Sequence, residues 1–342
     1  MTNYSFLDDY SEGAHPALLR ALTDTNMVQQ TAYGADTYSR EARQLLSQHM
    51  GDLRPDIWFV ASGTLANILA ISSTLRSHEA VIAPASGHIV VRETGAIEAT
   101  GHKIITVSPK DGKLTPASIQ AALDNNAHFP HMAKPRMVYI SNATEVGTLY
   151  TKPELQEISQ LCKTRDLLLL LDGARLGAAL AADKNDLTLA DIAELCDIFW
   201  IGGTKVGALL GEAVVIPNVD LRDDFSFHIK QRGALLAKGR MLGLQFRELF
   251  RDGLYFDLSR HANRMASHLS LGISRCGYPF LAPTETNQVF PVLPNALIDE
   301  LKKCFDFYVW EPHDQSSSVL RLVTSWATLE EQVDAFIAKL EG

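Results

Sequence analysis

Two polar side chains follow neighbouring apolar runs in the middle of the sequence, and together they could carry chemistry. Leu167–Leu171 leads into Asp172-Gly173-Ala174-Arg175, and Asp197–Ile201 leads into Gly202-Gly203-Thr204-Lys205. Such continuous apolar runs predict strands buried on both faces of a parallel sheet, whose ligands bind beyond the carboxyl ends of the strands. An acid and a lysine at that edge suit pyridoxal phosphate, because the lysine can form a Schiff base with its aldehyde and the acid can keep its ring nitrogen protonated.

Each of these residues has a simpler explanation when it is taken alone. Asp172 could cap the helix that follows it, Arg175 could form an ion pair, and Lys205 could be an ordinary turn residue. The functional interpretation depends on the three side chains lying at one edge of one sheet.

Two further segments are placed to contribute to the same edge. Ser62-Gly63-Thr64 follows an apolar run and opens a predicted helix, whose free N–H groups could bind a phosphate, although the same residues also form ordinary N-caps. His88 follows the next strand; an imidazole there could stack on a planar ring and move protons, or it could be a loop residue with no special role. The other histidines show no metal-ligand spacing, so we expect no metal.

Apolar runs and amphipathic segments alternate along most of the chain, which predicts an α/β fold with a mostly parallel, seven-stranded sheet and helices on both faces. The predicted strands are Ile57–Val60, Ala80–Ala83, Lys103–Val107, Arg136–Ile140, Leu167–Leu171, Asp197–Ile201 and Ala213–Ile216. The predicted helices are Thr64–Leu75, Pro116–Leu123, Lys152–Arg165 and Leu189–Leu195.

The pattern changes after residue 233. A helical stretch from Leu235 to Leu254 continues through Asp257–Cys276 into short strands, and a helix over Leu329–Leu340 follows them. The predicted short strands are Phe280–Ala282, Gln288–Val292, Phe307–Trp310 and Val319–Thr324. We predict an N-terminal arm (1–20), a large α/β domain (21–240) and a small α+β domain (241–342), with the arm near the small domain or a neighbouring subunit.

Composition narrows the class of protein. The 342 residues include 46% hydrophobic and 21% charged residues, which is ordinary for a globular enzyme. A net charge of −9 argues against a nucleic-acid partner. Four scattered cysteines, no apolar leader at the N-terminus and no membrane-length apolar run together predict a cytoplasmic protein without membrane association.

These motifs resemble the fold-type I pyridoxal-phosphate enzymes, and within them the low-specificity L-threonine aldolases of the β-eliminating lyase family. The resemblance covers most of the chain. The matching segments are Tyr33-Gly34-Ala35-Asp36, Gly63-Thr64-Leu65-Ala66-Asn67, Gly87-His88, Glu93-Thr94-Gly95-Ala96, Asp172-Gly173-Ala174-Arg175, Thr204-Lys205 and Arg321-Leu322-Val323-Thr324.

The resemblance implies a role for each matching residue. Lys205 would bind the cofactor covalently, Asp172 would pair with its ring nitrogen, and His88 would stack on the ring. Gly63, Thr64 and Thr204 would contact the cofactor, with Gly63 and Thr64 holding its phosphate. Arg175 would lie beside the cofactor, and Arg175 and Arg321 would bind the carboxylate of an amino-acid substrate, for which a guanidinium fork is well shaped. The active sites would be shared in a homodimer or homotetramer, in which Tyr33 is a candidate to bind substrate and to reach a neighbour's cofactor, although an exposed loop position is at least as good an explanation.

The sequence departs from the family pattern at two places. Asp8-Asp9-Tyr10-Ser11 stands where members often have Arg-Ser-Asp-Thr, and Ala143-Thr144-Glu145-Val146-Gly147 stands where many have Asn-Thr-His-Asn-Gly. Glu145 could replace the histidine as a proton carrier beside His88.

The expected activity is cleavage of the Cα–Cβ bond of L-threonine and L-allo-threonine to glycine and an aldehyde. A β-eliminating lyase or an aminotransferase would use the same cofactor and break another bond. A catalytically silent cofactor-binding protein is a third possibility. A nucleotide-binding module is disfavoured, because no GxGxxG follows the early strands.

Overall fold

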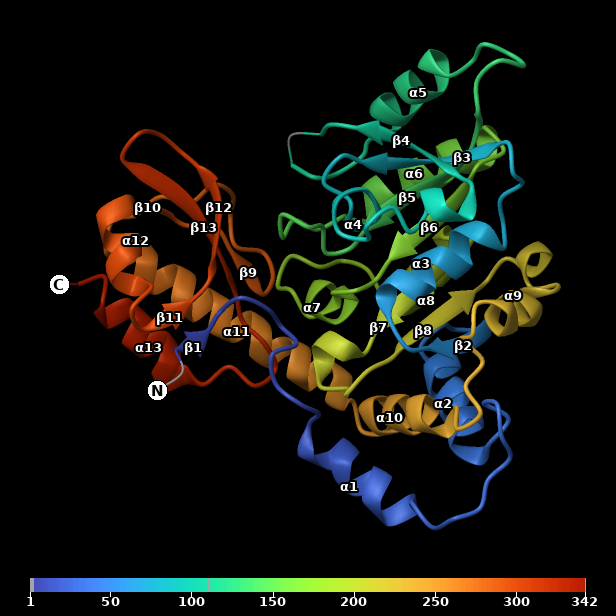
Figure 1. Cartoon of the computed structure of the whole chain (residues 1–342), viewed down its shortest axis with the longest axis horizontal. Helices are drawn as coiled ribbons and strands as arrows, with labels where there is room; N and C mark the ends of the chain where they lie inside the picture. The colour runs from blue at the N-terminus through green and yellow to red at the C-terminus, as the bar shows by residue number, and fades with distance from the viewer. Residues whose placement is uncertain (1–2, 110, 342) are drawn as a thin grey trace.

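A seven-stranded sheet forms the centre of the larger part of the molecule in the computed structural model, which describes residues 3–109 and 111–341 (Figure 1). The strands lie in the order β2-β8-β7-β6-β5-β3-β4. Only β8 runs antiparallel to its neighbours β2 and β7. Their bounds are β2 (Asp56–Val60), β3 (Glu79–Pro84), β4 (Lys103–Val107), β5 (Lys134–Ser141), β6 (Leu168–Asp172), β7 (Ile198–Gly202) and β8 (Glu212–Ile216). All seven predicted strands and the predicted fold class are confirmed.

Helices cover both faces of this sheet, and the leucines of β6 contribute to the hydrophobic core on each face. Leu169 and Leu171 pack in the core of one face, and Leu168 and Leu170 pack in the core of the other. The first face is covered by α2 (Thr37–Gln48), α5 (Pro116–Asn125), α6 (Lys152–Thr164), α7 (Leu176–Leu180), α8 (Leu189–Leu195) and α10 (Arg240–Arg251), with α1 (Pro16–Thr25) at its margin. The second is covered by α3 (Gly63–Ser72), α4 (His88–Val91) and α9 (Phe225–Gln231). Because both faces are covered, every residue of β6 is buried, as the unbroken apolar run requires.

The predicted helical stretch from Leu235 to Leu254 is wrong at its start. Residues 235–239 are not helical, because Ala237 uses its carbonyl to accept a hydrogen bond from the backbone of Tyr33 (3.0 Å). Helix α10 begins at Arg240 and ends before Gly253, whose φ of 74° ends the helical path. The long helix α11 (Leu254–Arg275) then leads toward the smaller part of the molecule.

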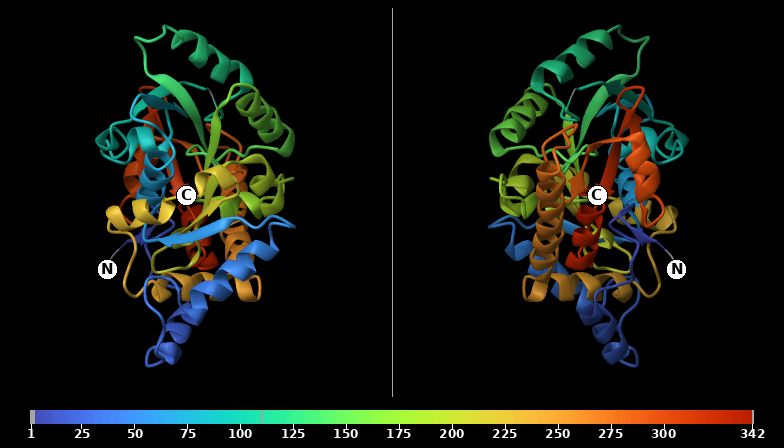
Figure 2. Two further views of the ribbon diagram at one scale, coloured as in Figure 1. Left: turned by 90° about the vertical axis from the view of Figure 1, so that its right-hand side faces the viewer. Right: turned by 90° about the vertical axis from the view of Figure 1, so that its left-hand side faces the viewer.

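The smaller part is built on an antiparallel sheet of β10 (Val292–Pro294), β13 (Ser317–Val323) and β12 (Tyr308–Pro312), with β9 (Gln288–Val289) also paired to β13. Helices α11, α12 (Asn295–Leu301) and α13 (Glu330–Ala338) pack around it (Figures 1 and 2). The predicted strand Gln288–Val292 is divided into β9 and β10, because Pro291 has no N–H to give a ladder. The predicted strand Phe280–Ala282 is reduced to one bridge between Phe280 and Pro291.

The N-terminal arm lies against the smaller part of the molecule, which is one of the two positions expected for it. Strand β1 (Tyr4–Ser5) pairs in parallel with β11 (Phe305–Asp306). Phe6 is fully buried and its ring lies 5.6 Å from that of Phe336. The first two residues of the predicted arm lie outside the described residues.

The division of the chain after residue 240 remains a proposal. Phe246, Leu249 and Phe250 of α10, and Tyr255 and Leu258 of α11, pack in the core of the large sheet. These helices therefore extend the large part beyond the predicted boundary before α11 enters the small one. None of the helices in the described ranges has the length and apolar character that a bilayer crossing requires.

Candidate active site

The loops that follow β6 and β7 are packed so closely that glycine is needed between them. The amide of Gly202 donates to the carbonyl of Gly173 (3.0 Å), and a Cβ on Gly173 would lie 1.8 Å from the carbonyl oxygen of Trp200. This contact brings the ends of the two strands together. Asp172 is the last residue of β6, and Lys205 lies in the 3-10 turn Thr204–Val206 just after β7, close enough for the two charges to interact.

Asp172 is a buried carboxylate held by three neutral donors. The Tyr139 hydroxyl donates to its Oδ2 (2.6 Å), as does the Asn67 amide (3.1 Å), and the backbone of Ala174 donates to Oδ1 (3.0 Å). Neutral donors fix the position of a carboxylate without cancelling its charge. Burial and the nearby charge of Asp172 raise the pKa of Tyr139, so its hydroxyl stays protonated and remains a donor.

Lys205 carries an amine that the protein leaves free for chemistry. Among the described residues its Nζ forms no hydrogen bond or ion pair, and it lies 5.9 Å from the ring centroid of Tyr10. Burial and the positive charge of Arg175 lower the pKa of the amine, against the opposing charges of Asp9, Asp172 and Glu212. A lowered pKa favours the neutral amine, which is the nucleophilic form.

Helix α3 presents its first turn at the same edge. Ser62 caps the helix by accepting from the amide of Leu65 (3.3 Å). Over the described part of the chain, the amides of Gly63 and Thr64 and the Thr64 hydroxyl have no protein partner. Gly63 is also required sterically, since its Cβ would lie 2.7 Å from the Trp200 ring. These groups suit a phosphate.

His88 is the first residue of helix α4 and contacts two acidic residues, one through its ring and one through its backbone amide. Its Nδ1 lies 2.8 Å from Oε1 of Glu93, whose side chain is completely buried, while 41% of the His88 side chain is exposed. Its backbone amide donates to Oε1 of Glu145 (3.0 Å). The Ser141 hydroxyl donates to the same oxygen (2.8 Å), and the other oxygen of Glu145 is buried without a partner among the described residues. Burial and Asp172 raise the pKa of Glu145.

Arg175 and Arg321 bring two guanidinium groups to the site from different sheets. Arg175 donates through Nε (2.7 Å) and Nη2 (3.0 Å) to the buried carboxylate of Asp9. Arg321, on β13, donates through Nε and Nη2 to the Gln288 side-chain oxygen (3.1 and 2.9 Å). Burial, and after it the charge of Arg175, lowers the pKa of Arg321 to about 10. Of these two arginines only Arg175 is paired with a carboxylate, that of Asp9, so the guanidinium of Arg321 favours an added anion.

Two predicted site residues are placed differently from what their roles require. The Thr204 hydroxyl donates to Glu212 (2.8 Å) and accepts from Gly211 (3.1 Å), so its only proton is already used inside the turn. Tyr33 is 49% exposed and its ring lies under Lys230 (4.9 Å), on the surface of the chain. Its backbone amide donates to the carbonyl of Ala237 (3.0 Å).

Several residues of this site carry little signal in the sequence. Asp9 and Tyr10 lay in the segment noted as departing from the family pattern, and Asn67 and Glu93 lay inside matching motifs without an assigned role. Tyr139 and Gln288 had no signal beyond their place near strand ends. Their roles depend on partners far away in the sequence. Asp9 and Arg175, for example, are 166 positions apart.

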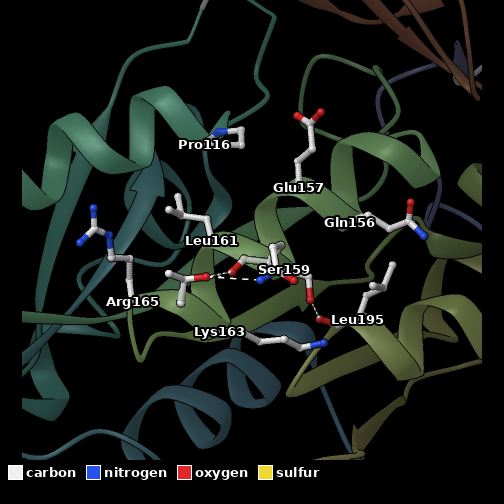
Figure 3. Close-up of a pocket in the computed structure, with 10 residues that line it drawn as sticks. Pro116, Gln156, Glu157, Ser159, Leu161, Lys163, Arg165 and Leu195 are labelled. Atoms are coloured by element: carbon white, nitrogen blue, oxygen red, sulfur yellow. Dashed lines mark hydrogen bonds between the residues drawn. The ribbon is translucent and has the colours of Figure 1, made fainter.

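A surface hollow of about 770 Å³ lies elsewhere, along the outer side of α6 (Figure 3). Ser159, Leu161 and Lys163 of α6 line it together with Leu195 of α8, and the Ser159 hydroxyl donates to the Leu195 carbonyl (2.7 Å). None of its lining residues belongs to the candidate active site.

Comparison with known proteins agrees with this geometry. Residues 7–296 match the family model described as beta-eliminating lyase. The chain is 35% identical to the low specificity L-threonine aldolase of Pseudomonas sp. (strain NCIMB 10558), over 100% of this chain and 99% of that protein. It is 33% identical to the low specificity L-threonine aldolase of Pseudomonas aeruginosa, over 97% and 96% of the two chains.

Solved structures show the same likeness. A threonine aldolase from Leishmania major superimposes with a TM-score of 0.97 and is 48% identical, covering 99% of this chain and 98% of that one. An aspartate aminotransferase from Thermus thermophilus shares the fold at 13% identity, with a TM-score of 0.73 over 98% and 90% of the chains. The family match and the full-length relatives together show that this chain belongs to the beta-eliminating lyase family.

Proposed function

We propose that this protein is a low-specificity L-threonine aldolase that uses pyridoxal phosphate, the cofactor that its family implies. The observation that carries the proposal is the free amine of Lys205 beside the fixed carboxylate of Asp172 and a pair of guanidinium groups. The full-length relatives named for this activity support it. When bound, the cofactor would attach to an amino group and withdraw electrons from the neighbouring carbon.

The residues of the site fit this cofactor. Lys205 would hold it covalently, and Asp172 would pair with its ring nitrogen. The free amides of Gly63 and Thr64 would bind its phosphate, and His88 would cover its ring. Thr204 would contribute by shaping the turn that carries Lys205, because its hydroxyl proton is donated to Glu212.

The guanidinium groups would hold the substrate. In Arg175 and in Arg321, Nε and Nη2 are engaged by the protein, and Nη1 has no hydrogen bond within the described residues. Both groups would therefore donate to the substrate carboxylate through Nη1, which fixes the direction of the remaining bonds at Cα.

Proton transfer would fall to His88 with Glu145. The substrate β-hydroxyl gives its proton to His88, and the electron pair of that O–H bond becomes the second bond of the aldehyde carbonyl as the Cα–Cβ bond breaks. Cα then regains a proton and glycine leaves. Glu145 keeps the start of α4 in place and, with a raised pKa, can take part in this transfer.

We also propose a homodimer or homotetramer in which Tyr33 faces a neighbour's substrate. Tyr33 supports this because it is exposed, and Met27 and Phe227 are exposed apolar residues (88% and 72%). Light scattering on purified protein measures the assembly. We further propose a cytoplasmic location, supported by the four free cysteines.

The central test is the absorbance spectrum of the purified protein with pyridoxal phosphate, followed by addition of L-threonine with detection of acetaldehyde and glycine. We expect a visible cofactor band and equal amounts of both products. Lys205→Ala should lose the band and at least about 1,000-fold in activity, while Lys339→Ala, an exposed control, should keep both. Ammonia with a keto acid in place of acetaldehyde would instead show an eliminating enzyme, and a band without turnover would show a silent binding protein.

A further inference from the structure

Asn67 is a fully buried amide that joins two of the acidic residues of the site. Its Nδ2 donates to Oε1 of Glu93 (2.8 Å) and to Oδ2 of Asp172 (3.1 Å). Its Oδ1 accepts from Nε1 of Trp200 (3.0 Å). Both amide protons are therefore used, one on each carboxylate.

Trp200 determines which way this amide faces. The indole nitrogen is only a donor, so the Asn67 oxygen has to face it and the NH2 group has to face the two acids. The indole itself occupies the space left by the missing side chain of Gly63. The glycine that opens the candidate phosphate site is thus also what allows Asn67 to be fixed.

Glu93 in turn determines the state of the His88 ring. Its Oε1 accepts from Asn67 and lies 2.8 Å from His88 Nδ1. A carboxylate oxygen can only accept a hydrogen bond, so a carboxylate at Glu93 would be paired with Nδ1–H of the neutral ring, which leaves the lone pair on Nε2. Nε2 is then the atom that can accept a proton from a substrate.

We propose that Glu93 and Asn67 are positioning residues that set the His88 tautomer and couple it to Asp172. Glu93 holds the proton on Nδ1, so that Nε2 accepts the β-hydroxyl proton, and the O–H bond breaks as the N–H bond forms. Asn67 holds Glu93 and Asp172 at fixed positions, so one side chain fixes both the carboxylate that would pair with the cofactor ring nitrogen and the carboxylate that bonds to His88. The catalytic consequence rests on the proposed aldolase function, whereas the tautomer can be measured without it.

The tautomer is tested by 15N NMR of the protein labelled at histidine, without cofactor or substrate. The chain has 11 histidines, and subtraction of the His88→Asn spectrum identifies the signals of His88. We expect the wild type to show Nδ1 protonated and Nε2 unprotonated, and Glu93→Ala to lose this pattern. Glu79→Gln is the matched control, because Glu79 is also buried (6% exposed) but bonds to the backbone of Arg76.

Kinetics then separate the two positioning residues. Glu93→Ala should lower kcat for threonine cleavage by about 100- to 10,000-fold, the usual range for general-base assistance, with KM changed less than about threefold. Glu93→Gln keeps the accepting oxygen and should restore most of the tautomer signal, with the pH profile displaced to lower pH. Asn67→Ala should disturb the His88 signals and also weaken pyridoxal phosphate binding at least about tenfold, measured by titration of the cofactor-free protein.

The outcomes are distinguishable. A His88 ring protonated on Nε2 in the wild type, or unchanged His88 signals in Glu93→Ala, would overturn the proposal whatever the activity. Asn67→Ala with normal cofactor affinity would remove the coupling to Asp172. The expected tautomer in a protein that forms no acetaldehyde would leave the positioning intact and reject the aldolase function.

Discussion

The two sides of the candidate site hold their charges in opposite ways. On the carboxylate side (Asp172, Glu93 and Glu145), hydroxyls, amides and the His88 ring supply the hydrogen bonds. On the cationic side, called the guanidinium side here (Arg175, Arg321 and Lys205), Asp9 pairs with Arg175 alone, Arg321 bonds to an amide oxygen, and the Lys205 amine has no hydrogen bond among the described residues. On the carboxylate side, one oxygen each of Glu93 and Glu145 is buried without a partner among the described residues. On the guanidinium side, Nη1 of both arginines has no hydrogen bond within the same part of the chain. The first arrangement fits the positioning of charge, and the second fits the binding of an anionic ligand.

Breaking the guanidinium side at Asp9 should have the largest effect. Asp9→Asn leaves the buried Arg175 without its carboxylate, and we expect a loss of about 3–5 kcal/mol in the free energy of unfolding. Urea denaturation measures it, with the exposed Asp52→Asn as a control that should stay within about 0.5 kcal/mol. Wild-type stability in Asp9→Asn would show that the pair contributes nothing.

The same variant makes a pH prediction. Burial alone would raise the pKa of Asp9, but Arg175, Lys205 and Asn287 outweigh it and lower the pKa. A lowered pKa means that the stabilisation is present above the pKa of the unfolded chain and is lost as the pH falls through the folded value. The difference between wild type and Asp9→Asn should therefore be constant near neutral pH and shrink below about pH 4.

The carboxylate side should respond in activity more than in stability. Asp172→Asn replaces one carboxylate oxygen with an NH2 group. Both oxygens of the wild-type side chain accept hydrogen bonds, from Tyr139, Asn67 and Ala174, so the new NH2 group faces a donor. We expect kcat/KM for threonine to fall at least about 100-fold with saturating cofactor, the equivalent of one charge-assisted hydrogen bond. Retention of full activity would mean that Asp172 does not face the cofactor.

A smaller effect is expected where an amino-acid carboxylate would bind. Arg321→Lys keeps the charge but loses the fork that bonds to Gln288, so the group is no longer oriented. KM for threonine should rise about 10- to 100-fold while kcat changes less than about threefold, because a carboxylate contact acts in ground and transition states alike. A fall in kcat at constant KM would place Arg321 elsewhere in the mechanism.

A further pH prediction concerns the turn that carries Lys205. Glu212 accepts from the amide of Gly203 (2.9 Å) and from Thr204, and burial raises its pKa to about 7. A raised pKa stabilises the folded state at pH values below the pKa of Glu212 in the unfolded chain. This stabilisation is lost as the pH rises toward 7. Relative to Glu212→Gln, the wild type should lose up to about 1.4 kcal/mol per pH unit between pH 5 and 7. Parallel pH curves for the two proteins would exclude a titrating Glu212.

The strands and the central site residues were predictable because their signals are local. An unbroken apolar run ending at Asp172, and another ending before Lys205, identify buried strands and their carboxyl ends without any knowledge of neighbours. His88 and Gly63 follow from the same rule. The helix break at residues 235–239 was not predictable in this way, because it depends on a backbone contact with Tyr33, some 200 residues earlier.

The partners of these residues could not be predicted for the same reason. Asn67 is an ordinary helical residue until Trp200, Glu93 and Asp172 surround it, and three separate segments have to fold before its role exists. Asp9 and Arg175 pair across the two parts of the molecule. Thr204 shows that closeness in sequence can also mislead. It is next to Lys205 in the sequence, but its hydroxyl donates to Glu212.

The N-terminal segment links the two parts of the molecule. Phe6 is buried in the core of the small part, and three residues later Asp9 forms an ion pair with Arg175 beside the large sheet. Arg321 reaches the same place from the small sheet. Movement of one sheet away from the other would separate these two cations, so the proposed binding of a substrate carboxylate would require the two parts of the molecule to stay in contact.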